Sequence, residues 1–410
     1  MILVDDILGL FLNIKTYKKN ISKLFDYCSK EIKEINTFIE NTTFLTRKDD
    51  QYLRLDKQSD LESKKGEELI FYIRKNKNEE FTFENPVPFK NITFNLDNIN
   101  NLNNKIWYVL NSNNPNICQN EDYYLCQDDI IRMGNVKLIV KEVHIKNEKE
   151  FDEIEISNPM KYNINLLNEN TGTIFNFCPQ IKKYILFSED SKNNKIKCNF
   201  CKKHECDKDN PLICFCSCND YYFHFLCLKD RIQKKTKIKQ NSSKTINNYY
   251  IKGEVSCQKC NLNYPLKFQI EGIEKFYEFI SIDTPKEGNY LILESIENKL
   301  YYGSMKFIFV IGLNEKVIKI GRGKANDVDI CDPSISKRQA EIKYEKGKIF
   351  LKNISEKYGT LILVKKSIKI NDNIITLQVG RSVIQAKQMK YGEFRKLELN
   401  NKHYPLSKKD

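Results

Sequence analysis

Nine of the fourteen cysteines fall between positions 198 and 260, and their spacing is typical of metal ligands. A Cys-x-x-Cys turn places two thiolates about one tetrahedral edge apart, which suits Zn²⁺. Sets of four thiolate and imidazole ligands also favour zinc over hard cations. Eight such ligands make two closed four-ligand sites without an open coordination position, so we expect two structural zinc ions. The expected ligands are Cys198, Cys201, Cys216, Cys218, His224, Cys227, Cys257 and Cys260.

The middle pair of ligands has two interpretations, because three cysteines compete for two places. The distance along the chain from segment 211–213 favours Cys216 and Cys218, whereas the distance to His224 favours Cys214 and Cys216. We expect the first pairing, and Cys214 in place of Cys218 stays the alternative. His204 and Cys206 are expected to take no part.

The order of these ligands resembles the RING-CH variant of the RING finger. The likeness is carried by segments 210–213 and 222–228, and by the closing segment 257–265. The cross-brace of that family implies that Cys198 and Cys201 share one ion with His224 and Cys227. The middle pair would then share the other ion with Cys257 and Cys260.

A RING finger holds a ubiquitin-conjugating enzyme and supplies no nucleophile of its own. The family contacts that enzyme through an apolar residue inside the first Cys pair, where this chain has Phe200. It also uses an aromatic residue and a proline, at places where this chain has Arg231 and Gln258. The resemblance implies a scaffold-type ubiquitin ligase, and the two departures keep a zinc-stabilised interaction module as the alternative.

The C-terminal part carries a second constellation, which could bind a phosphate group. Gly321-Arg322 is followed by Ser336-Lys337-Arg338-Gln339 and then by segment 355–360. This order closely resembles the forkhead-associated (FHA) domain, a β-sandwich that reads phosphothreonine. A phosphate carries nearly two negative charges and needs charge-assisted donors on a rigid frame. The contacts that the resemblance implies are Arg322, Ser336, Lys337 and Tyr358.

Two positions depart from the FHA pattern. The histidine that braces the loops in the family is Gln339 here, and glutamine can still form hydrogen bonds. The asparagine that grips the bound peptide in the family is Tyr358 here. The loop 355–359 is also one residue longer than usual.

Apolar periodicity then predicts the elements. Helical spacing around positions 7–14 and 21–28 predicts a helical N-terminus, and alternation with a period of two predicts strands later in the chain. Segment 128–140 resembles the last hairpin of an FHA sandwich. The Lys-rich insert 229–256 is expected to extend a helix and then to loop out. The expected fold is multi-domain, α+β to mainly β, with a helical segment (1–48), a β-rich domain that resembles a degenerate FHA sandwich (50–147), a linker (148–195), a RING-CH-type cross-brace zinc finger (196–268), a connector (269–302), an FHA β-sandwich (303–392) and a polar tail (393–410).

Composition narrows the partners and the compartment. The net charge is +13, but no dense basic stripe with interleaved aromatic residues accompanies it, so nucleic acid is not expected as a partner. No basic region precedes the apolar start, and no apolar run reaches the ~18 residues of a membrane helix. We therefore expect a soluble protein of the cytoplasm or nucleus. In such a reducing compartment, clustered cysteines bind metal more often than they form disulfides.

The pairing of the two modules resembles ciliate-type proteins that join a RING-CH finger to an FHA domain. It implies an adaptor-type ubiquitin ligase, in which the sandwich binds a phosphothreonine-containing protein and the finger brings a conjugating enzyme. The alternative is a non-enzymatic, phospho-dependent scaffold with a structural zinc finger. No catalytic residue is expected under either interpretation.

Overall fold

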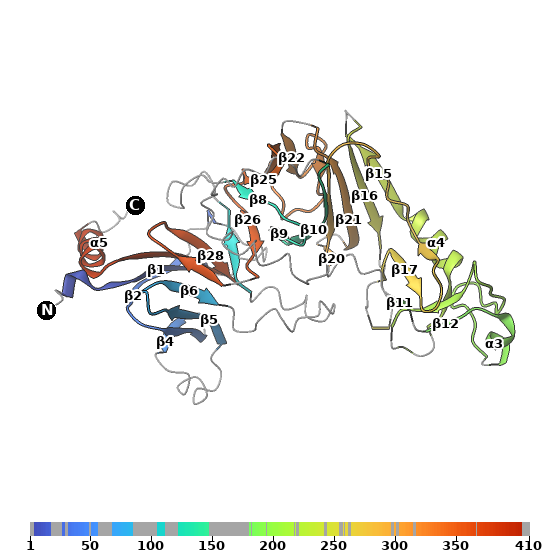
Figure 1. Ribbon diagram of the computed structural model, residues 1–410, viewed down its shortest axis with the longest axis horizontal. Coiled ribbons are helices and arrows are strands. Elements are labelled where there is room, and N and C mark those ends of the chain that lie inside the picture. The colour runs from blue at the N-terminus through green and yellow to red at the C-terminus, as the bar shows by residue number, and fades with distance from the viewer. Residues whose placement is uncertain are drawn as a thin grey trace, which may run out of the picture.

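Figure 1 shows the computed structural model of the chain, in which strands, most of them paired antiparallel, make up the larger part of the regular structure. Three of its elements, η1 (Val4–Asp6), β20 (Lys299–Leu300) and α5 (Tyr391–His403), are not counted in the two sandwiches and the finger described below. The described residues are 4–17, 27–28, 32–48, 51–55, 68–84, 105–110, 122–146, 180–181, 183–193, 195–216, 218, 221–241, 244–253, 257, 259–260, 264–296, 299–300, 303–314, 317–365 and 367–403.

The described residues form two β-sandwiches and a cysteine-rich finger. The first sandwich contains β1 (Leu8–Tyr17), β2 (Ile32–Ile39), β3 (Thr43–Lys48), β4 (Gln51–Leu55), β5 (Glu68–Lys75), β6 (Phe81–Glu84), β7 (Trp107–Val109), β27 (Ile368–Ile370), β28 (Ile375–Val379) and β29 (Ser382–Lys390). The second contains β8 (Tyr123–Tyr124), β9 (Ile130–Met133), β10 (Val136–His144), β19 (Tyr290–Ser295), β21 (Gly303–Gly312), β22 (Ile318–Gly321), β23 (Val328–Asp329), β24 (Ala340–Glu345), β25 (Lys348–Asn353) and β26 (Thr360–Leu363). The finger contains β11 (Gln180–Ile181), β12 (Lys183–Ile185), α3 (Ser188–Asn193), β13 (Leu212–Cys214), β14 (Phe223–His224), α4 (Phe225–Lys234), β15 (Thr236–Gln240), β16 (Ile246–Lys252), β17 (Lys267–Ile270) and β18 (Phe276–Glu278).

The predicted helical N-terminus is wrong, because the described residues there form strands β1 and β2. β1 lies between β2 and β29 and is buried on both faces, so its apolar residues do not alternate with polar ones. A continuous apolar run of this kind is ambiguous between helix and strand. The period-two set Leu10, Leu12 and Ile14 is the one that fills the core. Of the second predicted helix, residues 21–26 lie outside the described residues.

The mainly β character and the C-terminal sandwich are confirmed, and the strand order shows how the two sandwiches are joined. One sheet runs β15-β16-β21-β19-β10-β9-β26-β7-β28-β29-β1-β2. On either side of the central β26–β7 pair the order mirrors itself, since β9, β10, β19 and β21 on one side match β28, β29, β1 and β2 on the other. Two five-stranded sheets, β23-β22-β24-β25-β8 and β4-β3-β5-β6-β27, cover the two halves and match in the same way.

The two sandwiches exchange their last strands. The first is completed by β27, β28 and β29 from the far end of the chain, and the second is completed by β8, β9 and β10 from residues 123–144. The exchange is visible in the cores, because Met133 and Leu138 pack with Ile320 and Leu351, whereas Ile384 packs with residues of β1. The boundaries 50–147 and 303–392 stay predictions, and each segment contributes strands to both sandwiches.

The finger is inserted between β10 and β19 and is tied to the second sandwich by a hairpin. β15 and β16 pair with each other, and β16 pairs with β21 along seven residue pairs, so the hairpin extends the large sheet. The Lys-rich insert was expected to loop out, and the structure instead has this hairpin. β15 is almost entirely exposed, so its sequence carries no alternation that would have predicted a strand.

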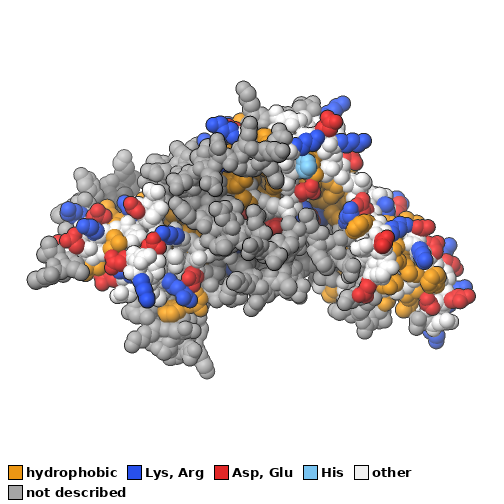
Figure 2. Space-filling model, viewed as in Figure 1, with side chains coloured by type: hydrophobic (Ala, Val, Ile, Leu, Met, Phe, Trp, Pro, Cys, Tyr) orange, Lys and Arg blue, Asp and Glu red, His pale blue; other side chains and the backbone are white. Residues whose placement is uncertain are grey.

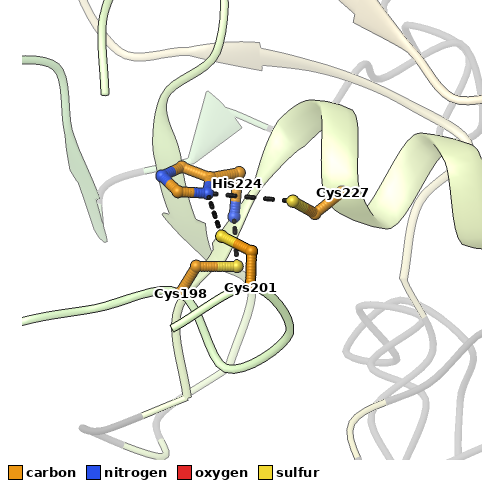
Figure 3. A group of neighbouring side chains, drawn as sticks. All are labelled: Cys198, Cys201, His224 and Cys227. Atoms are coloured by element: carbon orange, nitrogen blue, oxygen red, sulfur yellow. Dashed lines mark hydrogen bonds between the residues drawn. The ribbon is translucent and has the colours of Figure 1, made fainter. Parts of the chain in front are cut away.

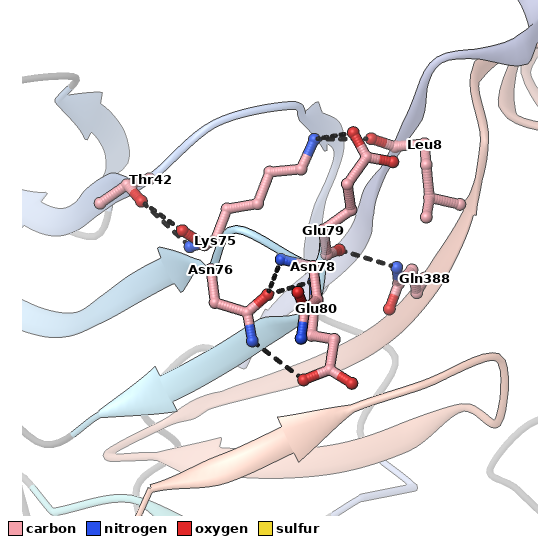
Figure 4. A network of polar contacts seen from close by, with 8 residues as sticks. All are labelled: Leu8, Thr42, Lys75, Asn76, Asn78, Glu79, Glu80 and Gln388. Carbon is pink, nitrogen blue, oxygen red and sulfur yellow. Dashed lines mark hydrogen bonds and ion pairs between the residues drawn. The ribbon is translucent and has the colours of Figure 1, made fainter.

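Residues from both ends of the chain also meet at the turn between β5 and β6 (Figure 4). Lys75 Nζ donates to the carbonyl oxygen of Leu8 at 3.4 Å, and Gln388 Nε2 donates to that of Glu79 at 3.0 Å. The amide oxygen of Asn76 accepts two backbone N–H groups of the turn, both at 2.9 Å. The turn is therefore ordered by its own asparagine and docked onto β1 and β29.

Among the helices of the described residues, none has the length and apolar character that a membrane span requires.

Asp129, at the start of the exchanged β9–β10 hairpin, gives the second sandwich an expected pH dependence. Its carboxylate accepts the N–H of Cys126 at 2.8 Å and the hydroxyl of Tyr123 at 3.3 Å. Burial raises the pKa of Asp129 to about 6, and Lys365 offsets this only in part. An unfolded aspartate has a pKa of ~4, so folding favours the protonated form of Asp129. Its contribution to the free energy of unfolding is therefore present at low pH and is lost as the pH rises from about 4 to about 6.

We expect Asp129→Asn to be more stable than the wild type at pH 7, by about 1–3 kcal/mol, because asparagine keeps an acceptor and removes the buried charge. The difference should shrink as the pH falls towards 4, where the folded carboxyl is protonated and the unfolded carboxyl is about half protonated. Urea denaturation at pH 4 and pH 7 measures both values. A wild type more stable than the variant at pH 7 contradicts the assignment.

Candidate functional site

Three loops meet at one end of the sheet β23-β22-β24-β25-β8, and they carry the four residues predicted to contact phosphate. The N–H of Arg322 donates to the carbonyl oxygen of Ser336 at 2.9 Å. The Ser336 hydroxyl lies 2.7 Å from that of Ser355, which in turn accepts the N–H of Tyr358 at 3.2 Å. The structure therefore joins the loops of Arg322, Ser336 and Tyr358 by direct hydrogen bonds, and Lys337 follows Ser336 on the surface.

Gln339 braces two of these loops from below. Its side chain is fully buried, its amide oxygen accepts the N–H of Ser336 at 3.0 Å, and its amide nitrogen donates to the carbonyl oxygen of Gly359 at 2.6 Å. The same nitrogen lies 3.2 Å from the Thr360 hydroxyl. Glutamine thus offers one acceptor and one donor where the FHA pattern has histidine, and both are used.

We expect Gln339→Leu to lower the free energy of unfolding by about 2–4 kcal/mol, because buried partners in two loops lose their hydrogen bonds. Gln339→His, which restores the residue of the FHA pattern, should cost less than about 1.5 kcal/mol because one ring nitrogen can accept and the other can donate. Denaturant unfolding of the full chain compares the two variants. Equal stability of the leucine variant and the wild type would show that the brace is not needed.

The loop of Arg322 approaches the loop of Ser336 closely enough to require a glycine. A Cβ on Gly321 would lie 2.4 Å from the carbonyl oxygen of Lys337, a distance that real Cβ atoms do not show. The side chain of Asn326 reinforces the approach, because its amide donates to the carbonyl oxygens of Gly323 at 3.1 Å and Lys337 at 2.9 Å. Gly321 therefore sets the distance between the two loops.

Two segments from the first third of the chain support the loops of Ser336 and Tyr358. At the tip of the β9–β10 hairpin, the N–H of Asn135 donates to the Ser334 hydroxyl at 2.9 Å, and Gly134 (φ +56°) packs against the Ser334 backbone. The N–H of Tyr27 donates to the carbonyl oxygen of Lys357 at 3.0 Å, and its ring covers Gly359. The loops are thus held from two sides by the first third of the chain.

The surface of the three loops is basic. Arg322, Lys324, Lys337 and Arg338 are exposed, and only Arg338 has an ion pair within the described residues, at 3.3 Å from Glu341. In Figure 2, Lys and Arg side chains lie along the top of the molecule with acidic side chains among them, where Figure 1 places β22, β15 and β16. An exposed guanidinium beside a serine hydroxyl is a suitable donor set for a phosphate.

The finger brings four predicted ligands together in a first group that could hold a metal ion (Figure 3). The ligand atoms of Cys198, Cys201, His224 and Cys227 all lie within 4.8 Å of one another. His224 Nδ1 is 3.1 Å from the Cys201 sulfur and 3.8 Å from the Cys227 sulfur. β14 presents the histidine and the first turn of α4 presents Cys227, so the strand-to-helix segment supplies half of the group.

The second group contains Cys216, Cys218, Cys257 and Cys260, whose sulfur atoms also lie within 4.8 Å of one another. The sulfur atoms of Cys216 and Cys257 are 3.5 Å apart. A tetrahedral Zn–S site with ~2.3 Å bonds needs sulfur atoms a little under ~4 Å apart, so both groups fit zinc without large movement. The ligands alternate along the chain between the two groups, which is the cross-brace arrangement.

The thiols of the first group differ in acidity. Burial alone raises the pKa of Cys198, but hydrogen bonds from the His224 ring and from backbone N–H groups outweigh it and lower the pKa to about 6. Burial, followed by the neighbouring cysteines, raises the pKa of Cys227 to about 12. A metal ion bound by Cys227 would take the place of this thiol proton.

The remaining candidates in the finger lie outside both groups. The buried Cys214 donates its thiol to the carbonyl oxygens of Cys216 and Cys218, at 3.3 and 3.4 Å, so it shapes the backbone of the second group. His204 Nδ1 lies 2.5 Å from the carbonyl oxygen of Ile196. Cys206 is buried, and its backbone N–H donates to the Ser188 hydroxyl at 3.0 Å.

Phe200, the predicted contact for a conjugating enzyme, is partly covered. Its ring packs on Phe223 with the ring centroids 4.4 Å apart, and the guanidinium of Arg231 lies 4.8 Å from its centroid. Arg231 stands where the RING-CH pattern has an aromatic residue. This departure therefore lies at the predicted contact itself, where the arginine covers part of the apolar surface that docking would use.

Comparison with known proteins identifies one of the two modules. Residues 318–383 match the family model of the FHA domain. The match runs without interruption from β22 to the start of β29, although the structure places β22–β26 in the second sandwich and β27–β29 in the first. No curated protein matches the chain, and no solved structure does. The chain thus contains an FHA domain whose linear sequence is divided between two sandwiches.

Proposed function

We propose that the protein is an adaptor that binds phosphothreonine-containing partners through the loops of Arg322, Ser336 and Tyr358. The observation that carries the proposal is an exposed Arg322 without an ion pair among the described residues, set beside a Ser336 that the buried Gln339 holds in place. Charge-assisted hydrogen bonds from such a donor set are roughly twice as strong as neutral ones. Phosphopeptide capture by basic loops is a recurring mode of recognition.

The test is binding of degenerate peptides that carry phosphothreonine, phosphoserine or unmodified threonine to the full chain. We expect measurable affinity for the phosphothreonine set and at least a tenfold weaker affinity for the unmodified set. The family's peptide-gripping asparagine is Tyr358 here, so the sequence preference around the phosphothreonine should differ from that of FHA domains with asparagine. Equal affinity for modified and unmodified peptides would refute the proposal.

We further propose that both ligand groups of the finger hold Zn²⁺ and that the ions are structural. Each group has four protein ligands, which leaves no position for a substrate or a reactive water. The chain's own contribution is to bring β14 and α4 against Cys198 and Cys201, and to bring Cys216 and Cys218 against Cys257 and Cys260. The bound ions would supply folding free energy to a module whose buried residues include several of the ligands themselves.

A ubiquitin ligase is the second candidate function, and it depends on the finger alone. The order of the ligands favours it, and the packing of Arg231 over Phe200 weighs against it. A ubiquitination assay with a panel of conjugating enzymes separates the two. Ubiquitin chains with the wild type that disappear with Cys198→Ser would establish the ligase, and zinc-loaded protein without chains would leave the adaptor as a scaffold.

A further inference from the structure

The hairpin β15–β16 reaches from the finger to the loop that carries Arg322. The hydroxyl of Tyr250 donates to the carbonyl oxygen of Asp329 at 2.7 Å, and the side-chain amide of Asn248 donates to the carbonyl oxygen of Asp327 at 3.0 Å. Both donors are almost fully buried, at 5% and 4% exposure. These two hydrogen bonds fix the C-terminal half of the loop 321–329 to β16, a strand of the finger.

Asp329 links the hairpin to Gly323, the residue that follows Arg322. One carboxylate oxygen of Asp329 accepts the N–H of Gly323 at 2.8 Å. The other oxygen lies 3.3 Å from Lys239 Nζ, on β15. The position of the Gly323 backbone, and with it the base of the Arg322 side chain, therefore depends on an aspartate whose own backbone and side chain are both held by the hairpin.

The two faces of β16 contribute to two different cores. Tyr249 and Ile251 pack in the core of the finger together with Cys257 and Phe268, whereas Ile246 and Tyr250 pack in the core of the second sandwich. Since side chains alternate along a strand, one rigid element is shared by both units. A shift of the finger relative to the hairpin would disturb Tyr250.

The hairpin is also bounded by both ligand groups along the chain. Cys227 of the first group lies in α4, which leads directly into β15, and Cys257 of the second group follows β16 after five positions. The junction is closed by backbone bonds, because the N–H of Lys252 donates to the carbonyl oxygen of Lys235 at 3.0 Å. The start of β15 therefore follows a ligand of the first group, and the end of β16 precedes a ligand of the second group.

We infer that β15–β16 is a positioning element of the phosphate-binding loops, and that metal binding by the finger raises the affinity of those loops for phosphopeptides. The inference rests on the proposed phosphothreonine binding. Tyr250 and Asn248 are positioning residues, since they act through Asp329 and Asp327 and contact no ligand. Zinc binding orders α4 and the segment around Cys257, the ordered finger fixes β16, and β16 fixes the loop from which Arg322 projects.

The experiment compares Tyr250→Phe with Tyr249→Phe in the full zinc-loaded chain. Tyr249 is a matched control because its buried hydroxyl also makes one hydrogen bond, from the N–H of Asp283 at 2.9 Å, but on the finger face of the same strand. The first readout is hydrogen exchange of the amides of Gly323 and Ile330, which needs no ligand. The second is the affinity for the best phosphothreonine peptide.

We expect Tyr250→Phe to speed exchange at Gly323 by about fivefold and to weaken peptide binding by a similar factor, which is the effect of one lost hydrogen bond. Tyr249→Phe should change neither by more than about twofold. Removing zinc with a chelator from the wild type should speed exchange at Gly323 by at least about tenfold and weaken peptide binding, with metal content measured alongside.

The readouts separate the two proposals. If the wild type binds no phosphopeptide, the proposed function fails, and exchange at Gly323 still decides whether the hairpin positions the loop. Equal exchange in the two tyrosine variants, or unchanged exchange and affinity after measured loss of zinc, would overturn the inference.

Discussion

Replacing Cys216 by serine is expected to remove one of two zinc ions and to unfold much of the finger. Cys216 lies in the second ligand group, 3.5 Å from Cys257, and both residues belong to the buried core of the finger. Structural zinc contributes on the order of 10–16 kcal/mol to the folding of small zinc modules, so losing one thiolate removes more stability than any apolar substitution in the same core. Metal analysis of the purified chain should fall from about two zinc ions to about one.

Cys214→Ser is the matched control, because Cys214 is equally buried, two residues away, and outside both groups. Its thiol makes only hydrogen bonds to two carbonyl oxygens, which a serine hydroxyl can also make. We expect two zinc ions to be retained and a loss of stability of about 1–2 kcal/mol. Zinc loss with Cys214→Ser but not with Cys218→Ser would instead support the alternative pairing of the middle ligands.

The two ligand groups show what could be predicted from spacing alone. Ligands in a Cys-x-x-Cys turn are neighbours whatever the rest of the chain does, so their pairing is a local property. The choice of Cys216 and Cys218 over Cys214 was not local. It depends on β13, the central strand of a small sheet, in which Cys214 pairs with Lys183 and its thiol donates to backbone carbonyl oxygens of the second group.

The exchange between the sandwiches could not be predicted, because both exchanged hairpins carry the same local pattern. Segment 128–131 reads Asp-Asp-Ile-Ile and segment 372–375 reads Asp-Asn-Ile-Ile, and the following turns each place a glycine at φ +56°, Gly134 and Gly380. Either hairpin offers suitable apolar residues to either sandwich. The chain passes from one sandwich to the other after β7 and again after β26, and these two strands pair with each other in the centre of the large sheet.

The hairpin β15–β16 was missed for a related reason. β15 is exposed on nearly every residue, and β16 is buried on both faces, so neither alternates between polar and apolar residues. Periodicity identifies strands that have one face in a core and one in solvent. A strand shared by two cores, such as β16, reads instead as a mixed polar and aromatic segment.

Arg322→Ala is expected to weaken phosphothreonine-peptide binding by at least about 100-fold without changing the stability of the chain. Hydrogen bonds to a charged group contribute about 1.5–3 kcal/mol each, and an arginine can make two to one phosphate. The Arg322 side chain is exposed and has no ion pair among the described residues, so its loss should alter the free energy of unfolding by no more than about 0.5 kcal/mol. Isothermal titration with the best peptide, together with thermal unfolding, measures both.

Arg338→Ala is the matched control for Arg322→Ala, since it removes the same charge from the neighbouring loop. Arg338 is exposed, and its guanidinium already pairs with Glu341 at 3.3 Å. Only the general electrostatic attraction for the phosphopeptide should fall, by less than about threefold and less still at high salt. A large and equal loss in both arginine variants would mean that net charge rather than a phosphate contact holds the peptide. Arg322→Lys, which keeps the charge but not the fork of donors, should lie between the two.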